Sequence, residues 1–336
     1  MRIVNNVAIV GVTTWGITLA IMASKSQNNK ITLLSRTEAE ATNLSKEGEC
    51  SRFLPGVRFP NSFTITSSVK DAISNANIII LAVPSHSFRR NIAEIAPAIP
   101  SHSILVSATK GLEMPNKLRM SEIVGEELSK EICENLCVIS GPNLAKEIVV
   151  GKPSSSVVAS NNIVNAQLVR DVLMQPTFRI YTSDDVIGVE LCGTLKNIIA
   201  IGAGIVDGLE LGDNSKAAYI TRGIAEISRL GTSLGASAHT FAGLAGVGDI
   251  VATSFSKLSR NRYLGEQIAL GRTLEQITYD MQNVIEGLET TRAAVELGEL
   301  LGVELPITQA IYKILFEGMQ PQQGIQELMN RPPTSE

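Results

Sequence analysis

The sequence predicts an α/β protein whose N-terminal domain is a doubly wound, mainly parallel sheet and whose C-terminal domain is all-helical. Short β-branched runs alternate with helical segments up to about residue 183, and strand-like runs cease after it. A length of 336 residues favours two domains, because a single core becomes hard to extend beyond roughly 250 to 300 residues. We therefore expect domains at 1–183 and 184–336.

Eight short apolar runs are the predicted strands. Most are continuously apolar rather than alternating, which is typical of strands that are buried on both faces of a parallel sheet covered by helices. The runs span residues 7–10, 31–34, 63–66, 78–83, 104–107, 136–139, 156–159 and 178–181.

The second half has apolar residues at helical spacing. Stretches such as 215–234 are rich in Ala, Leu, Ile, Glu and Arg, and Asp184 or Asp185 can cap the first helix. We expect helices throughout this half and a loose tail at 331–336.

The composition excludes several classes of partner and site. With 33 acidic against 29 basic residues and 4% aromatic content, the chain lacks the basic surface and stacking platforms of nucleic-acid-binding proteins. No apolar run reaches the ~20 residues of a membrane span, and the first residues do not form a signal peptide, so we expect a cytoplasmic protein. Four cysteines without a CxxC pair, and three scattered histidines, predict reduced cysteines and no metal site.

The first predicted strand leads into a glycine-containing turn of the Rossmann type. Gly11 and Gly16 occupy the outer positions of a GxGxxG fingerprint, whereas Thr13 replaces the glycine that lets backbone approach a pyrophosphate. Arg36, after the second strand, suits the 2′-phosphate of NADP, where an acid would hold the ribose of NAD. NADPH/NADP is the expected cofactor and NADH/NAD the alternative. The competing interpretation of Gly11 and Gly16 is that they serve packing only, and that of Arg36 is a solvated arginine at the end of a strand.

Two lysines are candidates for the chemistry of a site. Lys196 lies in a strongly apolar helical segment, 191–201, where partial desolvation would lower its pKa towards the working pH and suit it to proton transfer. Lys110 follows a predicted strand at its carboxyl end, where open α/β sheets bind ligands. The alternative for Lys196 is a lysine whose aliphatic stem extends to the surface so that the ammonium reaches solvent. The alternative for Lys110 is a lysine in a surface turn.

Ser259 and Arg260 form a candidate phosphate site. Ser259 can cap the helix that follows it, so that free N–H groups and the Arg260 guanidinium face the same anion. A simple helix cap with exposed arginines is the alternative.

Motifs along nearly the whole chain form one series. In the first half they are 11–20 (GVTTWGITLA), 54–56 (LPG), 78–86 (IIILAVPSH), 107–113 (SATKGLE) and 140–143 (SGPN); in the second they are 188–197 (GVELCGTLKN), 212–214 (GDN), 221–223 (TRG), 241–249 (FAGLAGVGD), 259–262 (SRNR) and 286–287 (EG). In this order the motifs resemble the bacterial-type NAD(P)-dependent sn-glycerol-3-phosphate dehydrogenases. The resemblance implies reduction of dihydroxyacetone phosphate with NADPH or NADH for glycerophospholipid synthesis, by a protein that is commonly a homodimer.

The resemblance also implies roles for particular residues. Lys196 is then the proton acceptor in the oxidative direction, Lys110 touches both cofactor and substrate, and Asp249 contacts substrate and pairs with or orients Lys196; these three are the catalytic candidates. The implied substrate contacts further include Gly141, Asn143, Ser259, Arg260 and Asn261, and the implied cofactor contacts are Gly11, Thr14, Trp15, Gly16, Arg36, Lys110, Ala145, Arg260, Val284 and Glu286.

Two competing functions stay open on the sequence alone. A related two-domain dehydrogenase of another small hydroxy substrate would share the architecture and a lysine, although 259–262 favours a phosphorylated three-carbon substrate. A non-catalytic NADP-binding sensor is motivated by Thr13. The sequence retains Lys110, Lys196, Asp249 and Arg260, the charged residues that the chemistry needs, and this argues against the sensor.

Overall fold

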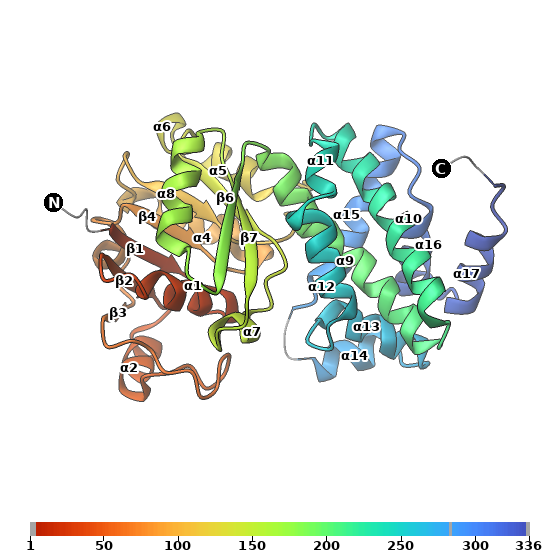
Figure 1. Cartoon of the computed structure of the whole chain (residues 1–336), viewed down its shortest axis with the longest axis horizontal. Coiled ribbons are helices and arrows are strands. Elements are labelled where there is room, and N and C mark those ends of the chain that lie inside the picture. The colour runs from red at the N-terminus through yellow and green to blue at the C-terminus, as the bar shows by residue number, and fades with distance from the viewer. Residues whose placement is uncertain (1–4, 282–283, 334–336) are drawn as a thin grey trace. The chain divides into compact units, whose positions relative to one another are not determined.

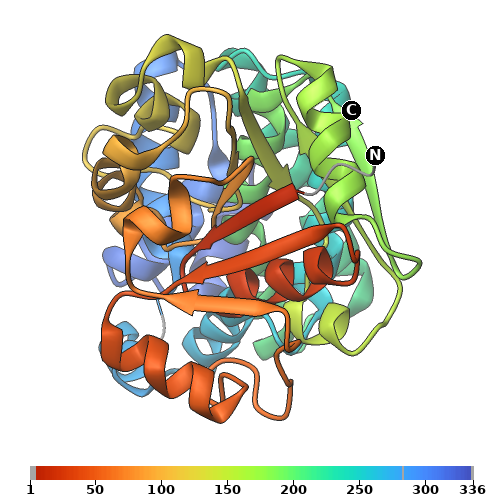
Figure 2. The ribbon, with the colours of Figure 1, turned by 90° about the vertical axis from the view of Figure 1, so that its left-hand side faces the viewer.

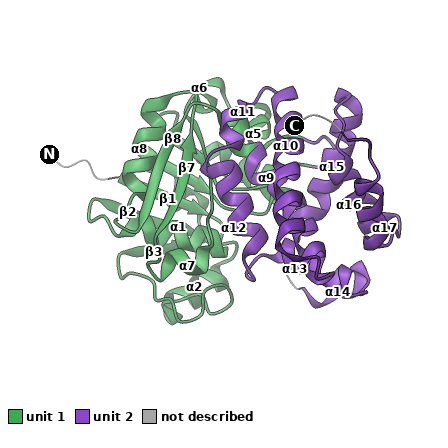
Figure 3. Cartoon of the chain, turned by 45° about the vertical axis from the view of Figure 1, so that its right-hand side comes forward, with its two compact units in different colours: residues 1–113, 118–190 green, residues 114–117, 191–336 purple. Residues whose placement is uncertain are grey.

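The computed structural model describes residues 5–281 and 284–333 (Figure 1). The chain divides into two compact units (Figure 3). Unit 1 comprises Met1–Glu113 and Leu118–Glu190, and unit 2 comprises Met114–Lys117 and Leu191–Glu336. The division after Glu190 falls inside a helix, α9 (Val186–Gly208), whereas the sequence analysis placed a boundary at 183/184, where the last predicted strand ends.

Unit 1 is built on a mainly parallel sheet, in which the strand order is β3-β2-β1-β4-β5-β6-β7-β8. Of the strand pairs in the described residues, only β6 and β7 run antiparallel. Figure 2 shows β3, β2 and β1 side by side at one edge. Each predicted run forms a strand: β1 (Asn5–Val10), β2 (Asn29–Leu34), β3 (Phe63–Thr66), β4 (Ile78–Leu81), β5 (Ile104–Ser107), β6 (Leu136–Ser140), β7 (Ser154–Ala159) and β8 (Phe178–Ser183).

Helices cover both faces of the sheet, and the continuous apolar runs account for this arrangement. In β4, Ile78 and Ile80 belong to one core cluster, whereas Ile79 and Leu81 belong to the other, because alternate strand residues face opposite sides. The unit 1 helices are α1 (Thr14–Ser24), α2 (Glu38–Glu47), α3 (Val69–Ile73), α4 (Phe88–Ile95), α5 (Met120–Glu127), α6 (Lys130–Cys133), α7 (Ala145–Val149) and α8 (Ile163–Leu173), with short 3₁₀ turns at Ser85–Ser87 and Ala96–Ala98.

All regular secondary structure in the described residues of unit 2 is helical, as the apolar spacing predicts. Asp185 precedes the first helix and accepts a hydrogen bond from the Gly188 amide at 2.8 Å, which is the predicted capping role. After α9 the helices are α10 (Gly212–Ser233), α11 (Ala238–Phe241), a π-helical turn η3 (Leu244–Gly248), α12 (Asp249–Phe255), α13 (Arg260–Ala269), α14 (Leu274–Asp280), α15 (Glu286–Leu301), α16 (Pro306–Phe316) and α17 (Pro321–Met329).

Helix α9 is long and apolar enough to cross a membrane by length and composition alone. It contains charged residues, among them Lys196, so it does not appear in the sequence as one uninterrupted apolar run. The most apolar 18-residue window has a mean hydropathy of 1.5, and 89% of it is buried inside the fold. This burial is typical of the core helix of a globular protein.

Glycines bring α9 and α13 into close contact within unit 2. A Cβ atom on Gly204 would lie 1.9 Å from the carbonyl oxygen of Arg262, and one on Gly265 would lie 1.8 Å from the carbonyl oxygen of Ile201. Only glycine permits the two backbones to approach this closely. The contact places the polar residues of α9 beside those at the start of α13.

Candidate functional site

The turn after β1 depends on both of its glycines. Gly11 has a φ of +117°, and a Cβ at this position would lie 2.7 Å from the carbonyl oxygen of Ala82. A Cβ on Gly16 would lie 2.3 Å from the carbonyl oxygen of Gly11. The turn is therefore as tight as a dinucleotide fingerprint requires, and it directs the N-terminus of α1 towards the carboxyl end of β1.

Thr13 takes part in this turn through its hydroxyl group. The Thr13 Oγ1 donates a hydrogen bond to the carbonyl oxygen of Ala82 at 2.8 Å and accepts one from the Gly16 amide at 3.0 Å. Thr13 is thus the N-cap of α1 and ties the helix to the end of β4. The cap uses an amide of the first helical turn, which would otherwise be open to an anion.

The strand order places this turn at a ligand-binding position. After β1 the chain winds outwards to β2 and β3, and it then returns to β4 on the other side of β1. Doubly wound sheets bind ligands at such a switch point, beside the carboxyl ends of the strands. The glycine geometry and the helix N-terminus fit the pyrophosphate of a dinucleotide here, and Thr14 and Trp15 open the helix with partly exposed side chains.

Arg36 lies just after β2, the neighbour of β1. Its side chain is 71% exposed, and the closest approach of its guanidinium to Glu40 is 4.0 Å. The Arg36 amide donates to the Glu40 carboxylate at 2.9 Å, so the backbone is fixed while the guanidinium extends into solvent. Such a group can receive a phosphate without first breaking a short ion pair.

Three of the predicted substrate residues of unit 1 lie together after β5 and β6. The Lys110 ammonium donates to the carbonyl oxygen of Gly141 at 3.3 Å. Asn143 donates to the carbonyl oxygen of Ser155 at 3.2 Å and accepts from the Ser156 hydroxyl at 2.9 Å, so its side chain is held against β7. Ala145 begins α7 and is half-buried.

Unit 2 joins Lys196 and Asp249 in a buried pair. Lys196 on α9 is 8% exposed and Asp249 at the start of α12 is 1% exposed. The Lys196 ammonium donates to the Asp249 carboxylate and, at 2.7 Å, to the hydroxyl of Thr253. Thr253 in turn donates to Asp249 at 3.0 Å. These three hydrogen bonds hold the Lys196 nitrogen at a defined position.

A second group of hydrogen-bonded polar residues includes Asn197, which follows Lys196 on α9. Asn261, on α13, donates to the Asn197 side-chain oxygen at 2.9 Å and accepts from the Gly287 amide at 3.2 Å. Asn197 is 3% exposed, and its Nδ2 has no hydrogen-bond partner among the described residues. An amide donor that is buried without a partner beside Lys196 is suited to an oxygen atom of a ligand.

The segment at 259–262 has the predicted helix cap. Ser259 accepts from the Arg262 amide at 3.2 Å and caps α13. The Arg260 guanidinium donates to the carbonyl oxygen of Val284 at 2.7 Å, so two residues expected to contact the cofactor are neighbours. Glu286, another of these residues, begins α15.

Two polar residues of unit 2 were missed by the sequence analysis. Thr253 lies four residues after Asp249, one helical turn away, and this spacing was a usable signal. Asn197 stands next to Lys196 in the LKN motif, but its burial and its unpartnered amide become apparent only when α9 and α13 pack together. No group of three or more His, Cys, Asp or Glu side chains within 5–281 and 284–333 could hold a metal ion.

Comparison with known proteins decides the family. Residues 6–166 match the N-terminal model and residues 185–326 the C-terminal model of NAD-dependent glycerol-3-phosphate dehydrogenase. The chain belongs to this family. Glycerol-3-phosphate dehydrogenase [NAD(P)+] of Dehalococcoides mccartyi is 45% identical over 99% of this chain and 92% of the relative, and that of Chlorobium phaeobacteroides is 42% identical over 98% and 99%.

A solved structure of a glycerol-3-phosphate dehydrogenase agrees with this assignment. The enzyme from Coxiella burnetii is 35% identical, and the two structures match with a TM-score of 0.91 over 98% of this chain and 99% of that one. Membership of the glycerol-3-phosphate dehydrogenase family makes the chain an oxidoreductase that uses NAD(P), and it favours neither a different hydroxy substrate nor a non-catalytic sensor.

Proposed function

We propose that the protein reduces dihydroxyacetone phosphate to sn-glycerol 3-phosphate with NADPH or NADH, reversibly, and so supplies glycerophospholipid synthesis. The observation that carries this proposal is the buried cluster of Lys196, Asp249 and Thr253. The chain that contains it is 45% identical to a glycerol-3-phosphate dehydrogenase [NAD(P)+]. Ketone reduction needs a hydride and a proton, and a reduced nicotinamide supplies the hydride when it is bound.

Lys196 is the proton donor in this reaction. Hydride transfer leaves negative charge on the former carbonyl oxygen, and a positioned ammonium stabilises this charge and then delivers its proton. Asp249 and Thr253 orient the ammonium, and Asp249 balances its charge inside the unit. In the oxidative direction Lys196 accepts the proton again.

Asn197, Asn261 and the start of α13 bind the substrate. The unpartnered Nδ2 of Asn197 donates to a substrate oxygen, and Asn261 fixes the orientation of the Asn197 amide. Ser259 and Arg260 hold the phosphate with the N-terminus of α13. Arg260, with Val284 and Glu286, also contributes to the cofactor site.

Unit 1 holds the cofactor and part of the substrate site. Gly11, Thr14, Trp15 and Gly16 receive the pyrophosphate half, and Arg36 binds the 2′-phosphate of NADPH. Ala145 contributes to the nicotinamide half, and Lys110, Gly141 and Asn143 contact the substrate.

The cellular setting and the oligomeric state are part of the same proposal. We propose a cytoplasmic homodimer that acts on a small phosphorylated substrate. Cys50, Cys137 and Cys192 are buried, Cys133 is partly exposed, and none of the four forms a disulfide bond.

The decisive experiment is the initial rate of NADPH oxidation with dihydroxyacetone phosphate, repeated with NADH and with Lys196→Ala. We expect oxidation that requires the substrate and a loss of at least ~100-fold in kcat in the variant, since proton transfer contributes 10²–10⁴-fold. Lys216→Ala is the matched control, because Lys216 is also a buried lysine paired with an aspartate, at 2.8 Å from Asp207. It should lower stability and retain most of the kcat; equal losses in both variants would refute the assignment.

A further inference from the structure

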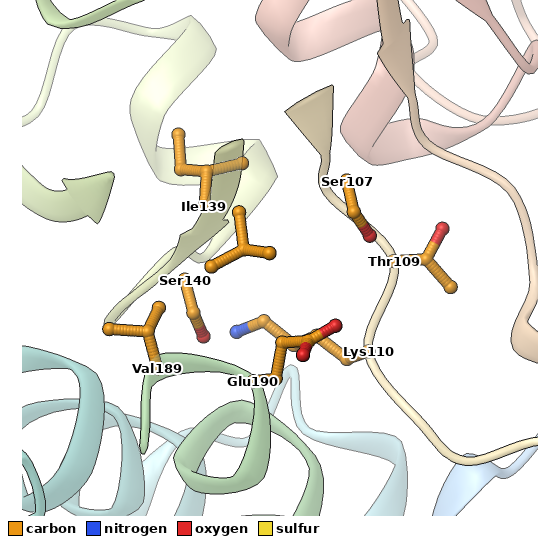
Figure 4. Close-up of a pocket in the computed structure, with 8 residues that line it drawn as sticks. Ser107, Thr109, Lys110, Ile139, Ser140, Val189 and Glu190 are labelled. Carbon is orange, nitrogen blue, oxygen red and sulfur yellow. The ribbon is translucent and has the colours of Figure 1, made fainter. Parts of the chain in front are cut away.

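A small polar pocket lies at the carboxyl ends of β5 and β6 in unit 1 (Figure 4). Its polar lining consists of Ser107, Thr109, Lys110, Ser140 and Glu190, and apolar side chains of β6 and the first turn of α9 complete the wall. We name it the Ser107–Ser140 pocket. Figure 4 shows the Lys110 side chain crossing this space, with its ammonium on the side of Ser140.

Two buried hydroxyl groups in the pocket lack a partner. Ser107 is 2% exposed and Ser140 is 3% exposed, and neither side-chain oxygen has a hydrogen bond among the described residues. Ser107 lies opposite Val138 in the sheet, and Ser140 is two residues beyond Val138, so both hydroxyls are on the same face. Because buried hydroxyls are nearly always hydrogen-bonded, this pair requires a partner other than the described residues.

Two other polar groups of the pocket, Thr109 and Glu190, are already engaged in hydrogen bonds with other described residues. The Thr109 hydroxyl donates to the carbonyl oxygen of Val83 at 2.8 Å. The Glu190 carboxylate accepts from the Ser121 amide at 2.9 Å and from Arg119 at 3.0 Å. The Ser121 hydroxyl donates to the same carboxylate oxygen as Arg119, Oε2, so that oxygen already accepts two hydrogen bonds. The other oxygen, Oε1, accepts from the Ser121 amide and keeps a lone pair for a small molecule in the pocket.

The pocket has the size of one water molecule. The volume open to the centre of a water is about 10 Å³. A polar cavity needs about one such volume, and two to four hydrogen-bonding groups, to hold a water. A water here can accept from the Lys110 ammonium and one serine hydroxyl while it donates to the other hydroxyl and to Glu190.

We propose that the Ser107–Ser140 pocket is a site for one ordered water molecule that positions the Lys110 ammonium. Ser107 and Ser140 are then positioning residues, which act on the reaction only through Lys110. The functional half of this inference rests on the substrate role proposed for Lys110, whereas the water site itself does not.

The water site is tested by crystal structures of the full-length enzyme and its Ser107→Ala/Ser140→Ala variant, without ligands. We expect density for one water within hydrogen-bonding distance of both serine hydroxyls in the wild type and none in the variant. A dry pocket in the wild type, or a water that does not contact the two hydroxyls, would overturn the proposal.

The positioning role is tested by a double-mutant cycle with Lys110→Met. The serine double variant should lower kcat/KM for dihydroxyacetone phosphate about 3- to 10-fold when Lys110 is present, and cause no further loss in the Lys110→Met enzyme. The same loss in both backgrounds would overturn the positioning role.

Ser160→Ala is the matched control for this cycle. Its hydroxyl is as buried as those of the pocket serines but donates to the carbonyl oxygen of Leu136 at 2.6 Å. It should lower the unfolding temperature and leave kcat/KM unchanged. If the wild type turns over no substrate, the proposed function fails, and the crystallographic test of the water site still stands.

Discussion

Thr13 is the residue at which this chain departs from the dinucleotide fingerprint, and its hydroxyl alters the N-terminus of α1. The hydroxyl accepts a hydrogen bond from the Gly16 amide at 3.0 Å, so one N–H donor of the first helical turn is already engaged within the protein. We predict that Thr13→Gly lowers the KM for NADPH, because that amide becomes available and the backbone can approach the pyrophosphate.

The same substitution should reduce stability slightly, since glycine replaces threonine as N-cap at a cost of a few tenths of a kcal/mol. Steady-state kinetics and thermal unfolding of the two proteins check both effects. An unchanged or raised KM would contradict the role assigned to Thr13. Asn162→Gly, which removes the side-chain N-cap of α8, is the control and should affect stability alone.

Arg36 is a second residue whose substitution should affect the two coenzymes differently. Since its guanidinium is exposed and 4.0 Å from the nearest carboxylate, we expect it to serve the 2′-phosphate that distinguishes NADPH from NADH. Arg36→Ala should raise the KM for NADPH about 10- to 100-fold, the effect of losing a charged hydrogen bond, and leave the KM for NADH unchanged.

Parallel kinetics with the two coenzymes check this effect. Arg58→Ala, which removes another exposed arginine of unit 1, should change neither constant. A similar rise in KM for both coenzymes would mean that Arg36 does not recognise the 2′-phosphate.

Individual residues were predictable from the sequence where local geometry decides their role. The N-cap at Ser259 and the tight turn at Gly11 follow from their immediate neighbours. Asn197 and Ser107 were not predictable, because their unpartnered polar atoms depend on which residues far away in sequence enclose them.

At the scale of elements, the continuous apolar runs predicted the strands because both faces of the sheet are covered. The antiparallel pairing of β6 with β7 could not be predicted, since an apolar run has the same composition in either direction. In the second half, the periodicity predicted helices but not the glycine contact between α9 and α13.

Helix α16 has an N-terminal cap that comes from another helix. It begins with Pro306 and has no side-chain cap of its own. Glu226 of α10, 1% exposed, accepts from the Ile307 amide at 2.8 Å and from both the amide and the hydroxyl of Thr308 at 2.7 Å. We predict that Glu226→Ala lowers the free energy of unfolding by about 2–4 kcal/mol, because buried donors lose their acceptor. Urea denaturation measures this loss, and a change within experimental error would contradict the capping role.

The buried carboxyl group of Glu226 should also make the stability of the protein depend on pH. Burial raises the pKa of its carboxyl group above the ordinary 4.5 despite the hydrogen bonds from Thr308 and Ile307, so between 4.5 and the raised pKa the folded state binds more protons than the unfolded state. Its contribution to stability therefore falls as the pH rises through this window. The stability of the wild type relative to Glu226→Gln should decline as the pH increases from 4.5, and a constant difference would contradict the raised pKa.

At the scale of the whole molecule, the chain has two compact units, and the division between them falls within α9. The sequence analysis placed its domain boundary at 183/184, where the predicted strands end, and these domain bounds stay a prediction. The proposal of a homodimer belongs to this scale, and light scattering coupled to size exclusion should give about twice the chain mass of 36.0 kDa. A mass of one chain at micromolar concentration would contradict it.

Trp15 is the only tryptophan in the chain. It is half-buried in the first turn of α1, edge-on to the Phe178 ring at 6.4 Å. All indole emission of the protein therefore originates beside the turn at which the dinucleotide is expected to bind. The chain thus carries its own optical probe, so that coenzyme association can be followed by quenching of intrinsic fluorescence, without a label and without turnover.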